Sequence, residues 1–269
     1  MGRMTGMVAV IAGLIFALSP AAWAGTPHTP GIVPPQGHPH GATYGEWSAR
    51  WWQWAYQTPV HGPQGQVTPF LAGNGTAQSP APVDCRYGQS GHVWFLGGTY
   101  QPSFPGGGIT VSFFANRSCT IPSGTTLFLP IINSEWDNLN AVGQPPLTFD
   151  EAQLRAKAAA DINSIQSMSA TVDARPVQGV SGPETAYRVQ SPLFSYVLPS
   201  DNLPTAAFGV QFAGAAPPPG AVADGVFLMI APLSVGTHVL HWEGTARPPS
   251  GPFEQDITYH ITVTPRGGN

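Results

Sequence analysis

Residues 256–264 read DITYHITVT, a stretch in which Ile257, Tyr259, Ile261 and Val263 alternate with polar side chains. Such alternation is typical of a β-strand that buries one face and exposes the other. A second stretch rich in strand-forming residues, 237–245, precedes it, and the sequence PPSGP at 248–252 supplies a turn between the two. The chain is therefore predicted to end in a half-buried antiparallel hairpin.

Further strands are expected upstream of the hairpin. Residues 92–96, 109–115, 125–133 and 226–231 are apolar at successive positions, which is typical of central strands covered on both sides. Shorter strands are expected at 170–174, 186–190 and 194–198. The 32 glycines and 30 prolines interrupt the chain too often for many long helices. The pattern predicts a mainly β protein, an antiparallel β-sandwich or jelly-roll-like domain with two accessory helices.

The first accessory helix is expected to begin after Thr43, because Thr43 and Glu46 have the spacing of a capping box. Aromatic residues at positions 44, 47, 51 and 54 form one stripe, which would pack on a sheet. Trp52 and Tyr56 lie off this stripe, four residues apart. We therefore expect these two, rather than the stripe, to contact a ligand.

The second accessory helix is expected to follow a capping box formed by Thr148 and Glu151 and to run to about Ser167. Leu154, Ala158 and Ile162 recur on one side of it. This helix would also pack across a sheet.

The start of the chain has the order of a secretory signal. Arg3 precedes an apolar run at 7–18, and Ala22-Trp23-Ala24 supplies small residues for cleavage after Ala24. An apolar run of about twelve residues is too short to span a bilayer, which needs roughly 20. Residues 1–24 are therefore predicted to be a cleavable signal peptide, residues 25–42 a proline- and histidine-rich extended arm, and residues 43–269 a single β-rich domain. The mature protein is expected to be secreted or periplasmic, with no transmembrane segment.

The charge of the chain argues against some partners. Ten basic residues stand against 14 acidic ones, and removal of Arg3 leaves nine, for a net charge near −5. Nucleic acids and anionic membranes bind clustered Lys and Arg, and the only lysine is Lys157. We therefore expect neither as a partner.

Cys85 and Cys119 are the only cysteines, and an exported chain enters an oxidising compartment. A disulfide between them is predicted. By the chain-entropy model, closing a loop of this length stabilises a protein by roughly 3–4 kcal/mol.

The stretch NSEWDN at 133–138 places oxygen-bearing side chains at alternate positions after a buried strand. In an extended backbone, Asn133, Glu135 and Asp137 point the same way. They could then bind Ca²⁺ or act as general acid and base, and Trp136 adds an aromatic surface. A solvated loop after a strand explains the same residues equally simply.

The histidines offer weaker patterns. His38 and His40, with His61 nearby, could bind a transition metal, but a proline-broken arm explains them more simply. His241 and His260 are expected on the outer face of the hairpin, where a polar surface also accounts for them. The sequence has no G-x-S-x-G elbow, phosphate loop or H-E-x-x-H signature.

Several motifs resemble those of a group of exported bacterial proteins without assigned chemistry. They include WSARWWQW at 47–54, DCRYGQSGHVWFL at 84–96 and CTIP at 119–122 followed by LFLPIIN at 127–133. The resemblance covers most of the mature chain. It implies a bacterial envelope or secreted location and a shared fold, and it assigns no catalytic residue.

The leading functional prediction is binding of a ligand such as a glycan or another small molecule, in a cleft between the helix that carries Trp52 and the segment with Glu135 and Asp137. The alternative is a hydrolase or lyase that acts on an extracellular polymer through those two carboxyl groups, assisted by Glu46 or His92. A third possibility is a structural envelope protein. Composition does not separate the three.

Overall fold

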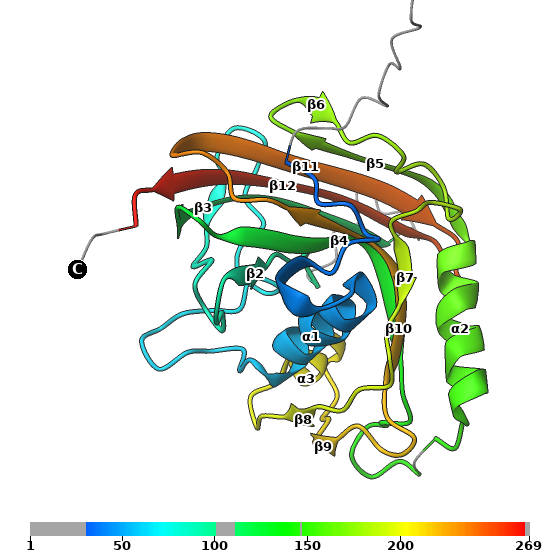
Figure 1. Ribbon diagram of the computed structural model, residues 1–269. Helices are drawn as coiled ribbons and strands as arrows, with labels where there is room; N and C mark the ends of the chain where they lie inside the picture. The colour runs from blue at the N-terminus through cyan, green and yellow to red at the C-terminus, as the bar shows by residue number, and fades with distance from the viewer. Residues whose placement is uncertain (1–30, 101–110, 146, 267–269) are drawn as a thin grey trace, which may run out of the picture.

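The computed structural model describes residues 31–100, 111–145 and 147–266. The predicted signal peptide and residues 25–30 of the arm lie outside the described residues. The described part is mainly β, with two packed sheets and accessory helices, so the predicted β-sandwich-like fold class is confirmed (Figure 1).

The larger sheet has six strands in the order β1-β3-β12-β11-β5-β6. Its strands are β1 (Ala81–Pro82), β3 (Val111–Pro122), β12 (Phe253–Thr264), β11 (Gly236–Ala246), β5 (Ile165–Val172) and β6 (Arg175–Pro176). β11 and β12 pair in antiparallel register along their whole length, from Gly236 opposite Val263 to Ala246 opposite Phe253. The predicted terminal hairpin is therefore confirmed.

The smaller sheet has four strands in the order β2-β4-β10-β7. They are β2 (Val93–Phe95), β4 (Thr126–Trp136), β10 (Val222–Ile230) and β7 (Arg188–Gln190). β8 (Val197–Leu198) and β9 (Gly214–Ala215) form a separate short pair. Every residue of β10 is buried, as expected for a central strand covered on both sides.

Most strand pairs in the described ranges are antiparallel, but three are parallel. β3 runs parallel to both β1 and β12, and β2 runs parallel to β4. Long connections separate β3 from β12 in the chain, so no tight turn forces them to run in opposite directions. Alternation along a strand reports burial and carries no information about the direction of its neighbour.

A β-bulge in β4 determines which way the second half of that strand faces. Ile132 pairs with Val226 and Pro130 with Phe227, so Ile131 is the extra residue. Before the bulge, odd-numbered residues such as Leu127 and Leu129 contact the core between the sheets. After the bulge the sides are exchanged. Asn133 and Glu135 lie opposite Gly225 and Ala223 of β10, on the side of β10 that packs against α1.

Helix α1 (Tyr44–Gln57) begins at the predicted capping box, in which Thr43 and Glu46 each bond to the other's backbone N–H. Helix α2 (Glu151–Asn163) starts later than predicted, because Asp150 with Gln153 forms the capping box instead of Thr148 with Glu151. It also ends earlier, since Ile165 already begins β5. A short helix, α3 (Leu203–Phe208), and a 3₁₀ turn at Pro39–Gly41 were not predicted.

Helices α1 and α2 cover opposite faces of the smaller sheet (Figure 1). α1 packs on the face with Phe128, Phe227 and Met229. The other face meets the six-stranded sheet and, toward the end of β4, α2. None of the helices in the described ranges is long and apolar enough to cross a bilayer.

Two links hold the periphery of this core. Cys85 and Cys119 form the predicted disulfide, with their Cα atoms 5.8 Å apart. The described part of the arm lies against β10, where the backbone N–H of Val33 donates to Met229 O at 2.9 Å. The hydroxyl of Tyr44 in α1 donates to Val33 O at 2.6 Å, so α1, the arm and β10 are joined.

Candidate functional site

Helix α1 carries four buried tryptophans, and three of them have a partner for the indole N–H. Trp47, Trp51 and Trp54 donate to the backbone carbonyls of residues 39, 96 and 87, at 2.9, 2.8 and 3.4 Å respectively. Trp52 is only 4 % exposed, and its Nε1 has no partner among the described residues. Trp52 was expected to lie apart from the packed stripe, but it belongs to the same core cluster.

Glu135 and Asp137 face α1 and are each held by a tyrosine. Tyr56 donates its hydroxyl to Glu135 Oε2 at 2.9 Å, and Tyr196 donates its hydroxyl to Asp137 Oδ2. The rings of the two tyrosines lie 4.8 Å apart. The predicted residues Tyr56, Glu135 and Asp137 are therefore brought together by α1, β4 and the segment before β8.

Burial controls the charge of this network. It raises the pKa of the Glu135 carboxyl well above its ordinary 4.5, and the negative charge of Asp137 raises it further. Burial and the charge of Glu135 also raise the pKa of the Tyr56 hydroxyl. Glu135 and Tyr56 therefore hold their protons more firmly than the same groups would in water.

Asn133 belongs to the same region, two residues before Glu135 on the same face. Gly225 lies opposite it on β10, and a Cβ atom added at Gly225 would approach Asn133 Cβ to 2.7 Å. The absence of a side chain at 225 leaves room for the Asn133 amide, whose Nδ2 is buried without a partner among the described residues.

Trp136 does not join this site, contrary to the sequence prediction. It lies on the opposite face of β4, where its Nε1 donates to Asp161 Oδ2 of α2 at 2.8 Å. The amino group of Lys157 lies 4.7 Å from the centre of its ring. The strand continues through Trp136, so neighbours 135 and 136 must point to opposite sides.

The proposed Ca²⁺ ligands have other partners. Tyr56 occupies one oxygen of Glu135, and the backbone N–H of Leu139 donates to Asp137 Oδ1 at 2.7 Å. The raised pKa of Glu135 also disfavours the carboxylate that a hard cation needs.

The histidines are dispersed over the molecule. His61 pairs with Asp201 at 3.0 Å, and His40 bonds to Thr126 Oγ1 at 3.0 Å. His241 pairs with Asp256 at 3.0 Å. In the described part of the chain, the one group of three metal-type ligands close together is His241, Glu243 and Asp256, on the six-stranded sheet.

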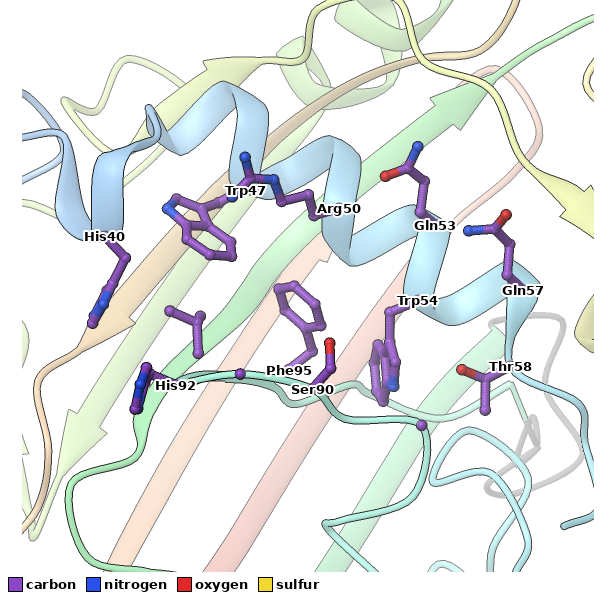
Figure 2. A pocket seen from close by; sticks show the side chains of 13 residues that line it. His40, Trp47, Arg50, Gln53, Trp54, Gln57, Thr58, Ser90, His92 and Phe95 are labelled. Carbon is purple, nitrogen blue, oxygen red and sulfur yellow. The ribbon is translucent and has the colours of Figure 1, made fainter.

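A groove that the sequence did not reveal runs along the other side of α1, with a volume of about 570 Å³. Figure 2 shows Trp47 and Trp54 of α1 reaching toward Phe95 of β2. Arg50, Ser90 and His92 are exposed and stand around these rings. Residues 88–92 form a loop with no regular period, so only the tertiary packing brings them beside the helix.

No protein-family model, curated protein or solved structure matches this chain. Function must therefore be inferred from the side chains. The chain offers two distinct places, the exposed groove on one side of α1 and the buried polar network on the other.

Proposed function

We propose that this chain is an exported saccharide-binding protein and that a sugar lies in the groove between α1 and residues 88–95. One observation carries the proposal, namely a groove of about 570 Å³ with a polar rim, in which the largely buried rings of Trp47 and Trp54 and the half-buried ring of Phe95 form an aromatic floor. Ligand sites of a few hundred Å³ typically combine apolar walls with a small number of polar groups. Aromatic rings offer flat surface to the apolar face of a sugar. The Cys85–Cys119 disulfide supports the export of the protein.

The charge around the groove favours an acidic sugar. Arg50 is exposed, and its guanidinium lies 4.5 Å from the centre of the Trp47 ring. No Asp or Glu is found among the described residues that line the groove. A carboxylate on the sugar would pair with Arg50 while the ring rests against the aromatic floor.

The hydrolase alternative has less support from the geometry. Glu135 has the raised pKa of a general acid, and a second carboxyl, Asp137, lies beside it. However, neither residue lines the groove, and both accept hydrogen bonds from tyrosines. The place with room for a sugar is therefore separate from the carboxyl pair.

Replacing Arg50 with glutamine should weaken binding of an oligouronate about two- to fivefold, because an exposed charge pair contributes about 0.5–1 kcal/mol. The affinity for a neutral oligosaccharide of the same length should change less than twofold. Isothermal titration calorimetry at low salt measures both. Arg86, which is exposed and does not line the groove, provides the control: R86Q should bind both sugars as the parent protein does.

Filling the groove tests the location of the site. The substitution Ser90→Trp places a large ring at an exposed position of the rim and should abolish binding of every sugar that the parent protein retains on a soluble glycan array. Ser250→Trp adds the same ring to an exposed turn and should have no effect. Retained binding in S90W, or no sugar bound by the parent protein, rejects the proposal.

A further inference from the structure

A small cavity lies on the inner side of α1, away from the sugar groove. Its volume is about 90 Å³, and its walls include Trp52 of α1, Asn133 of β4 and Tyr100. Phe113, Phe253 and Gln255, which are only half-buried, also line it. The lining therefore extends from the core to the start of β3 and β12.

Two of the walls present hydrogen-bond donors that nothing described in the structure satisfies. Trp52 Nε1 and Asn133 Nδ2 are both buried and unpartnered. Buried polar groups without partners are rare in folded proteins, and two that line the same small cavity call for a specific explanation.

Packing alone does not explain the unpartnered indole. The three other tryptophans of α1 all reach a backbone carbonyl, so the helix and its surroundings do provide acceptors. Trp52 is as deeply buried as they are and lines the cavity, yet its N–H meets no acceptor among the described residues. A hydrogen-bond acceptor on a bound ligand would satisfy the Trp52 N–H.

The chemistry of the walls restricts the ligand to an uncharged molecule. An anion would lose its hydration without gaining a charged partner, because no Lys or Arg is found among the described residues that line the cavity. A cation would offer no lone pair to Trp52 and Asn133, which can only donate through these atoms. A carbonyl oxygen has two lone pairs and can accept from both donors, and an amide N–H can donate to the side-chain carbonyl of Gln255, which also lines the cavity.

We propose that this cavity is a second binding site, for a small uncharged carboxamide whose carbonyl oxygen accepts from Trp52 and Asn133. The volume suits it, since about 90 Å³ holds roughly three water molecules or one planar molecule of about four non-hydrogen atoms. The site is separate from the sugar groove and does not depend on it.

Three probes of nearly the same size and shape test the charge requirement. Acetamide is neutral, acetate is an anion and acetamidinium is a cation. Each is titrated into the ¹⁵N-labelled exported protein while the indole N–H resonances are followed by NMR. The Trp52 resonance is identified as the one missing from W52F. We expect acetamide to shift this resonance in a saturable manner, with the two charged probes at least tenfold weaker.

Removing the Asn133 amide tests whether this side chain donates to the ligand. Asn133→Leu keeps the size of the side chain without its amide and should weaken acetamide at least tenfold, as read from the Trp52 resonance. Asn140→Leu is the matched control, because it makes the same change at an amide that donates to Pro145 O at 2.8 Å and does not line the cavity. N140L should bind acetamide with unchanged affinity, and thermal unfolding checks that both variants are folded.

Two results would overturn the proposal. One is a Trp52 resonance that acetamide leaves unmoved, which means that the cavity holds water only. The other is an equal shift with acetate or an unchanged affinity in N133L, which means that these donors do not select the ligand. Loss of sugar binding in S90W has no bearing on either result, so the two sites are tested independently.

Discussion

Replacing Arg188 with methionine should destabilise the protein by about 3–5 kcal/mol, because it leaves a buried carboxylate without its charged partner and with the neutral amide of Gln190, at 3.1 Å, as a remaining donor. Asp224 of β10 is fully buried, and Arg188 of β7 binds it through two parallel bonds, Nε to Oδ1 and Nη2 to Oδ2, each of 2.9 Å. Arg188 also donates to Asn163 Oδ1 of α2 at 2.7 Å. The substitution therefore weakens the attachment of β7 to both its neighbouring strand and α2.

Loss of the Arg188–Asp224 pair should also disturb the sugar groove. Gly45 of α1 packs so closely on β7 that an added Cβ would lie 2.5 Å from the carbonyl oxygen of Gln190. Displacement of β7 would therefore move the helix that separates the groove from the cavity. We expect R188M to weaken sugar binding even though Arg188 does not line the groove.

Urea unfolding measures the effect on stability, and Arg155 supplies the matched control. Arg155 pairs with the partly exposed Glu151 one helical turn away, at 2.8 Å, and donates to Ser191 O at 2.9 Å. Because R155M leaves no carboxylate buried without a charged partner, it should cost only about 1 kcal/mol. The double variant R188M/D224L removes the unpaired charge and should recover much of the loss. Equal costs for R188M and R155M would contradict this account of Asp224.

Between pH 4.5 and the raised pKa of Glu135, the parent protein should lose stability relative to E135Q by up to about 1.4 kcal/mol per pH unit. Burial and the charge of Asp137 raise the folded-state pKa of Glu135 above its ordinary 4.5. Below 4.5 the carboxyl is protonated in both the folded and the unfolded chain. The stabilising contribution of the bound proton is then fully present.

As the pH rises above 4.5, the unfolded chain releases its proton while folded Glu135 retains it. Folding then requires uptake of a proton, so stability falls until the pH reaches the folded pKa. Glutamine resembles the protonated carboxyl and can still accept from Tyr56, but it does not titrate. E135Q should therefore be more stable than the parent protein at neutral pH.

Chemical unfolding at several pH values measures how the free energy of unfolding changes with pH in E135Q and in the parent protein. Glu184 is exposed, and E184Q should follow the parent protein at every pH. Parallel curves for E135Q and the parent protein would show that Glu135 keeps an ordinary pKa, and the description of a proton-holding network would then be wrong.

Much of the fold could be predicted because the relevant signals are local. The capping box of Thr43 and Glu46, the alternation at 256–264 and the apolar run in β10 all depend on residues within a few positions of one another. The two cysteines allowed a single disulfide pairing within the chain. The second capping box was misplaced by two residues because Asp150 with Gln153 offers the same spacing as Thr148 with Glu151.

The site was predicted only in part, and the reason lies in the bulge of β4. Alternation correctly put Asn133 and Glu135 on one face, but the extra residue Ile131 sets which face that is. Regular pairing would have turned them toward the side of Leu127 and Leu129, between the sheets. Their meeting with Trp52 and Tyr56 follows from this switch.

Residue order alone was enough for the β-rich class, the hairpin, the start of α1 and the disulfide, since short-range spacing and composition govern these features. Strand direction, the bulge, the partners of each indole and the groove beside residues 88–92 emerged from folding. They depend on which distant segments pair and in what register. Those contacts join residues many tens of positions apart, for which a local pattern carries no signal.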